Sequence, residues 1–202
     1  MFIIKFGGSL STNPETISKI FEILEEISIN HKFILLPGGG EFADIVLKYY
    51  ETHNLNLKIS HNACILAMDI VGLILSNFTK IRTSYELKPN TIFLPSRLLI
   101  DSDLEISNEI TSDSIAVYVA NKFDTETVIL LKSVDGIFVN GKLCTEISAC
   151  ELEKINSNVV DSAFPNFIQK YKKVAYIING NFPERLVNLI NGREKIYTKI
   201  YL

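Results

Sequence analysis

The feature that most constrains how this chain folds is a run of three glycines between an apolar segment and a helical pattern. The apolar run at 33–36 stops at Pro37, and Gly38, Gly39 and Gly40 follow directly. Residues without a Cβ atom let an anionic oxygen approach the backbone N–H groups, and the positive end of the next helix dipole adds to the attraction. The pattern therefore predicts a phosphate-binding turn, with a plain strand-to-helix turn as the alternative.

A second glycine turn stands earlier in the chain, where the strand-like run 2–6 ends at Gly7, Gly8 and Ser9. Between the two turns, apolar residues recur at the spacing of one helix face: Ile17, Ile20, Phe21, Leu24 and Ile27. A strand–helix–strand unit of this kind is almost always a right-handed parallel crossover. Both turns are therefore expected at one edge of the same sheet, where α/β proteins bind ligands, and two adjacent anion sites predict two phosphate groups.

Strand and helix patterns alternate along the rest of the chain. Further strands are expected at 91–94, 128–131, 174–178 and 196–200, and further helices at 41–50, 61–78, 111–123 and 182–191. Asn140-Gly141 between two apolar segments predicts a β-hairpin, and 161–166 is expected to be irregular. This order predicts one domain, 1–202, folded as a three-layer α/β/α sandwich on a mostly parallel open sheet.

The composition argues against several function classes. The chain has 202 residues, of which 47% are hydrophobic, and a formal net charge of −3 without a long block of Lys or Arg, so we expect no nucleic-acid partner. The chain starts without a signal-peptide pattern, and we expect no apolar stretch near the roughly 18 residues that cross a bilayer. A cytoplasmic protein without membrane contact is therefore predicted. The three cysteines and three histidines show no metal-ligand spacing, which predicts that the protein has no preformed zinc site and no metal held by its own side chains.

Two common nucleotide-binding motifs fit parts of the chain. Residues 136–143 match G-x-x-x-x-G-K, but Leu143 stands where a Mg²⁺-binding Ser or Thr is needed, and the segment has a hairpin pattern. Residues 38–43 match the dinucleotide fingerprint G-x-G-x-x-A between a strand and a helix. Against it, no acidic residue ends a strand about 20 residues later, and Lys5 would have no role. A dinucleotide oxidoreductase stays the rival hypothesis.

Four segments, taken together and in this order, resemble the amino acid kinase family. They read KFGGSL at 5–10, PGGG at 37–40, TSDSIA at 111–116 and VDGIF at 134–138. The family includes acetylglutamate, uridylate and isopentenyl phosphate kinases. The resemblance implies phosphoryl transfer from ATP with Mg²⁺, and assembly into a homo-oligomer. It also implies an acceptor-binding half at 1–110 and an ATP-binding half at 111–202.

Within the family, the segments 60–69 and 179–185 look most similar to a short archaeal branch that phosphorylates an aminomethylfuran methyl phosphate in methanofuran synthesis. The substrate would then be a phosphorylated small molecule, a phosphate monoester, and the product a diphosphate. Isopentenyl phosphate, uridylate and an amino acid carboxylate are the alternative acceptors. A non-catalytic nucleotide- or oxyanion-binding protein is the alternative function.

Phosphoryl transfer needs positive charge, because bringing two like unit charges to 4 Å costs about 4 kcal/mol at an effective dielectric near 20. Lys5, at the end of the first strand, is the predicted catalytic cation, and the resemblance makes Asp113 the carboxylate that orients it. Where the family often has a second lysine, this chain has Asn166. We expect Lys132, at the end of a later strand, to replace that lysine together with Mg²⁺.

The resemblance also assigns binding residues. Those predicted to hold ATP and its phosphates are Gly7, Gly8, Ser9, Ser133, Asp135, Gly136 and Phe138. Those predicted to hold the acceptor are Gly38, Gly39, Gly40, His61 and Asp69. Asp69 is the carboxylate expected to meet an ammonium group on the acceptor. The alternative is that His61 caps its helix and that Asp69 is a surface acid.

Overall fold

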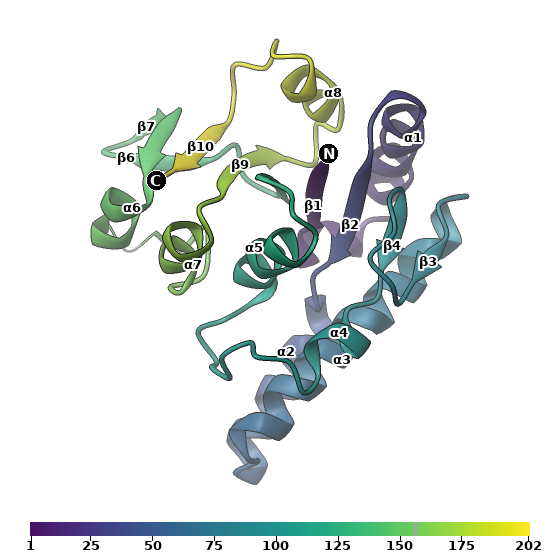
Figure 1. Ribbon diagram of the computed structural model, residues 1–202, viewed down its shortest axis with the longest axis vertical. Coiled ribbons are helices and arrows are strands. Elements are labelled where there is room, and N and C mark those ends of the chain that lie inside the picture. Colours follow the sequence, from purple (N-terminus) through teal and green to yellow (C-terminus); the bar gives the residue numbers. More distant parts are fainter. Residues whose placement is uncertain (156) are drawn as a thin grey trace.

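The computed structural model describes residues 1–155 and 157–202, and its central element is an eight-stranded sheet (Figure 1). The strand order is β3-β4-β2-β1-β5-β9-β10-β8. These strands are β1 (Phe2–Phe6), β2 (Phe33–Pro37), β3 (Thr83–Ser84), β4 (Thr91–Phe93), β5 (Thr127–Lys132), β8 (Glu146–Ser148), β9 (Val174–Asn179) and β10 (Thr198–Tyr201). Neighbouring strands are parallel except β9 and β10. The expected mostly parallel open sheet is confirmed.

Helices cover both faces of this sheet, as the three-layer prediction requires. In the described ranges they are α1 (Pro14–Asn30), α2 (Gly40–His53), α3 (Leu57–Leu75), α4 (Ser96–Leu99), α5 (Ser112–Lys122), α6 (Ala149–Ile155), α7 (Phe164–Tyr171) and α8 (Glu184–Ile190), with 3₁₀ turns η1 (Gly8–Thr12) and η2 (Ser76–Phe78). Helices α5, α6 and α7 pack on one face, and α1 and α8 pack on the other (Figure 1).

Two apolar cores follow from the alternation of side chains along the central strands. In β1, Ile3 packs on the α5 side and Ile4 on the α1 side, and both are fully buried. Val128 and Ile129 of β5 divide between the cores in the same way. Burial on both faces explains why these strands read as continuous apolar runs in the sequence. Polar chemistry is therefore confined to the strand ends and the turns that follow them.

The predicted β-hairpin is confirmed. Strands β6 (Ile137–Val139) and β7 (Lys142–Cys144) pair antiparallel directly after β5. Asn140 and Gly141 close them with φ values of 50° and 76°. Positive φ at both central residues is the requirement of a type I′ turn, which Asn-Gly meets at low cost.

Some helix and strand boundaries differ from the predictions. Helix α3 begins at Leu57, four residues before the expected start, because Asn56 accepts a hydrogen bond from the N–H of Lys58 (2.8 Å) and caps the helix there. Helix α7 begins at Phe164, inside the stretch expected to be irregular, with Pro165 in its first turn. The short edge strands β3 and β8 were not predicted, because two or three residues carry no periodic signal.

The prediction that no apolar segment has membrane length is wrong. The helical run Leu57–Phe78 has 22 residues and a mean hydropathy of 1.6, which is sufficient by length and composition to cross a bilayer. Half of that run is buried inside the protein, where Ile65 and Met68 join one core and Val71 and Leu75 join the other. Its place between two cores explains its hydropathy, and one such helix is weak grounds for a membrane span.

Candidate functional site

The two glycine turns lie in contact at the carboxyl edge of the sheet. The N–H of Gly38 donates to the carbonyl of Phe6 (2.9 Å), which ties the end of β2 to the end of β1. A Cβ atom on Gly8 would lie 2.8 Å from the Cα atom of Gly40, so the first turn has room only for glycine at this point. The expectation that both turns share one edge is confirmed.

A buried group of three charges joins the ends of β1 and β5 to the start of α5. Lys5 Nζ lies 2.9 Å from Asp113 Oδ1, and Lys132 Nζ donates a hydrogen bond to Asp113 Oδ2. The three side chains are at most 16% exposed. Thr111 caps α5 and so sets Asp113 in the first turn of the helix. The structure thus brings together the three side chains predicted to be catalytic.

This group carries one more positive than negative charge in a largely dry environment. Burial alone would raise the pKa of Asp113, but the charges of Lys5 and Lys132 outweigh burial and lower that pKa. Burial also lowers the pKa of Lys132, although the charge of Asp113 opposes this change. An anion bound beside the two lysines would therefore favour the protonated form of Lys132.

A pocket of about 300 Å³ opens beside the two lysines. It is lined by Lys5, Gly7, Gly8, Ser9, Lys132, Ser133, Val134, Asn158 and Val159. The Ser9 hydroxyl donates to Ser133 Oγ (3.2 Å), which joins the first glycine turn to the segment after β5. Ammonium groups, hydroxyls and glycine backbone together form a surface suited to a phosphate group.

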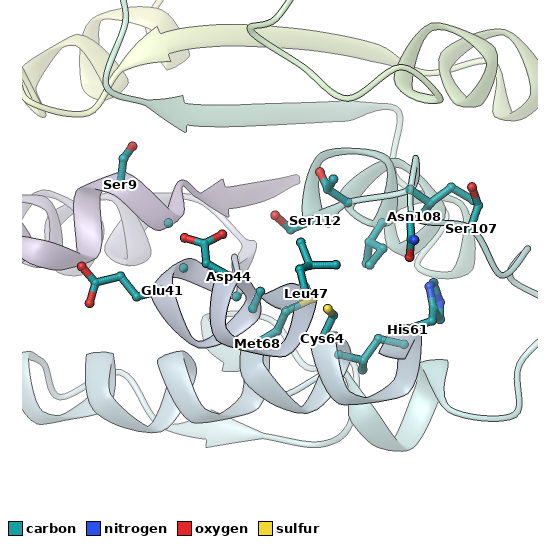
Figure 2. Close-up of a pocket in the computed structure, with 18 of the residues that line it drawn as sticks. Ser9, Glu41, Asp44, Leu47, His61, Cys64, Met68, Ser107, Asn108 and Ser112 are labelled. Atoms are coloured by element: carbon teal, nitrogen blue, oxygen red, sulfur yellow. The ribbon is translucent and has the colours of Figure 1, made fainter. Parts of the chain in front are cut away.

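Figure 2 shows a second pocket, of about 470 Å³. Gly8 and Ser9 line both pockets, so the two cavities meet at the first glycine turn. Gly39 and Gly40 place the amino end of the 14-residue helix α2 in the wall of the larger pocket. Because the free N–H groups at a helix start favour anions, the geometry provides two neighbouring anion sites.

His61 lines the larger pocket and Asp69 does not, and the binding of the acceptor by His61 stays a prediction. His61 lies inside α3 and does not cap it, and burial lowers its pKa against the opposing effect of a hydrogen bond with the backbone of Ser107. Asp69 is buried, and its Oδ1 accepts a hydrogen bond from the N–H of Ser96 (3.2 Å). Asp69 therefore holds α4 against α3 and is not a surface acid, so the surface-acid alternative is wrong, whereas its contact with the acceptor stays a prediction.

Asp135, Gly136 and Phe138, predicted to bind ATP, lie outside both pockets. Asp135 Oδ1 accepts hydrogen bonds from Arg185 (2.6 Å) and from the Asn179 side chain (2.9 Å), so this carboxylate links the segment after β5 to β9 and α8. Phe138 is 55% exposed on the hairpin. Their part in nucleotide binding stays a prediction.

The sequence analysis missed the role of Asp161. One of its carboxylate oxygens accepts hydrogen bonds from the N–H (3.1 Å) and hydroxyl (2.7 Å) of Thr111 and from the N–H of Ser114 (3.0 Å). Asp161 thereby fixes the amino end of the helix that carries Asp113. An acid five residues before Asn166 was the available signal. Asn166 itself is exposed on α7.

Comparisons with known proteins agree with this geometry. A model described as "Amino acid kinase family" matches residues 1–179. The "[5-(aminomethyl)furan-3-yl]methyl phosphate kinase" of Methanocaldococcus jannaschii is 36% identical over 213 residues, covering 99% of this chain and 97% of that protein. An acetylglutamate kinase of Endomicrobium trichonymphae is 24% identical over 241 residues, covering 96% of this chain and 95% of that protein. The uridylate kinase structure from Archaeoglobus fulgidus shares the fold with a TM-score of 0.74 at 18% identity, covering 99% of this chain and 100% of that one.

Proposed function

The chain belongs to the amino acid kinase family, and we propose that it transfers the γ-phosphoryl group of ATP to an aminomethylfuran methyl phosphate, forming a diphosphate. Its relatives and fold neighbours are kinases that act on small molecules. The support for this acceptor is the 36% identity to a kinase named for it, along 99% of the chain. The reaction type rests on one structural observation, the two pockets that meet at Gly8 beside the buried lysines.

We assign the ATP phosphates to the smaller pocket and the acceptor phosphate to the larger one. The smaller pocket holds both lysines and Ser133, as a polyphosphate requires. The larger pocket is formed mainly by residues before 111, which supports the division into an acceptor half at 1–110 and an ATP half at 111–202. Asp135, Gly136 and Phe138 belong to the ATP half in this assignment.

Transfer then depends on position and charge. The donor and acceptor phosphates approach each other across Gly8, where repulsion between unit charges at 4 Å is about 4 kcal/mol at an effective dielectric near 20. Lys5 and Lys132 supply positive charge at that point, and Asp113 keeps both ammonium groups in place. The N–H groups at the start of α2 hold the acceptor phosphate in line with the group that moves.

Kinases of this family generally use Mg²⁺ together with ATP. Within the described residues, no set of three or more His, Cys, Asp or Glu side chains is grouped to hold a metal. Mg²⁺ often binds through substrate phosphates with few protein ligands, so the site fits a metal that arrives with the triphosphate. When bound, Mg²⁺ would neutralise part of the phosphate charge.

The proposed reaction is tested by incubating the protein with ATP, Mg²⁺ and each candidate acceptor, and by measuring ADP and phosphorylated product in a single turnover. We expect ADP and a diphosphate with the aminomethylfuran phosphate. Faster turnover of isopentenyl phosphate, uridylate or an acidic amino acid would reassign the acceptor. NAD(H) binding without ATP binding would instead favour an oxidoreductase.

Asn166 favours one other function, that of a nucleotide- or oxyanion-binding protein without catalysis. Its position lacks the charge that relatives often place there, although Lys132 supplies a cation beside Asp113. ATP binding without ADP release for any acceptor, at enzyme in excess over ATP, would identify this function.

The geometry of the glycine turns makes a direct prediction. Gly8→Ala is expected to lower kcat/KM by at least about a hundredfold, because its methyl group would lie 2.8 Å from Gly40 Cα and displace one phosphate site from the other. Gly192→Ala is the matched control, since Gly192 has a φ of 68° with no atom within 4 Å of an added Cβ. The control should cost about 1 kcal/mol of unfolding free energy and leave kcat/KM unchanged. Equal kcat/KM values for Gly8→Ala and wild type would contradict the conclusion that Gly8 separates the two phosphate sites.

We further propose that the protein works in the cytoplasm as a homo-oligomer. Helices α2 and α3 expose several large apolar side chains: Ile45, Tyr49, Leu66, Ile70 and Leu73, each at least 42% exposed. Such a surface favours association with another chain. Light scattering of the purified protein should give a mass of at least twice 22.8 kDa, and a monomer at micromolar concentration would contradict this assembly.

A further inference from the structure

The larger pocket contains negative charge that its own side chains leave unbalanced. Glu41 and Asp44 both line it, and the described residues around it include no Lys or Arg. Neither carboxylate belongs to any of the ion pairs found among the described residues. The remaining basic group is His61, and burial lowers its pKa, which favours the neutral imidazole. The pocket is therefore lined by two acidic side chains and by no Lys or Arg that could pair with them.

Of the two carboxylates, Asp44 lies away from the amino end of α2, whereas Glu41 lies beside it. Figure 2 shows Ser9 and Glu41 at one end, His61, Ser107 and Asn108 at the other, and Asp44 between them. Glu41 stands in the first turn of α2, where its charge complements the helix dipole. Asp44 lies four residues after Gly40, about 6 Å further along the helix at 1.5 Å per residue.

The charge of Asp44 changes the pKa of another side chain that lines the pocket. Together with burial, its charge raises the pKa of the Cys64 thiol on the facing helix α3. Cys64 lines the same pocket and is half-buried. The charge of this carboxylate therefore affects at least one other side chain that lines the pocket.

We propose that Asp44 is the residue by which this pocket selects an acceptor carrying both a phosphate and an ammonium group. This inference rests on the proposed function, and it replaces the role that the sequence assigned to Asp69. The phosphate lies at the amino end of α2, and the ammonium group forms a charge-assisted hydrogen bond to Asp44 about one helical turn away.

The same charges select against other acceptors. An uncharged tail, as in isopentenyl phosphate, would cover Asp44 without giving it a partner, and a buried unpaired carboxylate is unfavourable. A dicarboxylic amino acid brings two carboxylates with its one ammonium group, so its charges would lie beside Glu41 as well as Asp44. An acceptor with a phosphate at the amino end of α2 and an ammonium group beside Asp44 gives that carboxylate a cationic partner.

The test measures binding and turnover separately. The probes are the aminomethylfuran methyl phosphate and the same compound with a methyl group in place of the aminomethyl group, both titrated calorimetrically in the presence of a non-hydrolysable ATP analogue. Wild type should bind the amine-bearing compound about tenfold or more tightly than the other, as expected for a hydrogen bond to a charged group. Asp44→Asn should reduce this preference to less than about twofold and raise the acceptor KM about tenfold, with kcat and the KM for ATP nearly unchanged.

Asp69→Asn is the matched control, because Asp69 is an aspartate of the same region that lies outside the pocket. It should retain the preference for the amine. Loss of the preference in Asp69→Asn but not in Asp44→Asn, or no preference in wild type, would overturn the inference. If the aminomethylfuran phosphate is turned over but binds no more tightly than the methyl analogue, only the role of Asp44 is contradicted. If it binds more tightly than the analogue but is not turned over, only the proposed reaction is contradicted.

Discussion

Lys132→Ala is expected to lower kcat by about 10²- to 10³-fold, with a smaller change in the KM for the acceptor. The Lys132 ammonium lies beside Asp113 in the pocket assigned to the ATP phosphates, and its side chain is 16% exposed. Charge stabilisation in such a dry site is worth far more than in water, and no cation is available at Asn166 to replace it. Steady-state kinetics with saturating ATP and acceptor measure the effect.

Two further variants, Lys5→Ala and Lys58→Ala, serve as comparisons for Lys132→Ala. Lys5→Ala should lose at least as much turnover, since Lys5 binds the other oxygen of Asp113. Lys58→Ala should keep wild-type turnover, because Lys58 is 56% exposed and lies outside both pockets. Near-normal turnover of Lys132→Ala, with Lys5→Ala inactive, would show that Lys132 does not replace the family's second lysine.

The charge state of Lys132 also predicts a pH dependence. Burial lowers its pKa from the ordinary value of 10.5, so the ammonium loses its proton at a lower pH than an exposed lysine does. Because transfer needs the protonated form, kcat/KM for ATP, which reports the free enzyme, should fall on the alkaline side as pH rises through this lowered pKa. A kcat/KM that is constant up to about pH 10.5 would contradict the requirement for a buried cation.

Asp113→Asn is expected to reduce the free energy of unfolding by about 3–5 kcal/mol and to abolish most activity. The Asp113 side chain is 5% exposed and forms ion pairs with two buried lysines, so its removal leaves both lysines without their ion-pair partner. Urea unfolding followed by circular dichroism measures the loss of stability.

The sign of the pH effect follows from the lowered pKa of Asp113. A carboxyl with a lower pKa in the folded state stabilises the protein above its unfolded pKa, near 3.8, and loses that contribution as pH falls through the folded value. The stability difference between wild type and Asp113→Asn should therefore be full at neutral pH and shrink below about pH 4. Asp101→Asn, which removes an exposed ion pair with Lys58, should change stability little at any pH. Equal losses of unfolding free energy in Asp113→Asn and Asp101→Asn would contradict the conclusion that the ion pairs of Asp113 are buried.

Local patterns predicted much of this molecule. The runs that became β1 and β2, the helix α1 between them and the Asn-Gly hairpin were all recognisable, because each depends on residues close together in the chain. Because the strand–helix–strand unit was expected to be a parallel crossover, both glycine turns were predicted at one edge of the sheet. The meeting of Lys5, Asp113 and Lys132 was expected from the strand ends and from the family resemblance.

Side-chain environments were less predictable. Asp69 was expected to contact the acceptor, and no local pattern indicated that the position of α4 would let its carboxylate accept a hydrogen bond from the N–H of Ser96. Asp161 looked like part of a loop, yet it caps α5 from 50 residues away in the sequence. The hydropathy of α3 indicates a buried helix, but only packing shows that it lies between two cores.

The sequence by itself determined the order of strands and helices, the two glycine turns and the family, since these depend on periodicity and on short motifs. Only the tertiary structure decided which carboxylate lines the larger pocket. Asp44 and Asp69 lie on different helices, and the choice between them depends on how α2, α3 and α4 pack against one another. Burial and charge at a site are set by residues far apart in the chain, which no local pattern records.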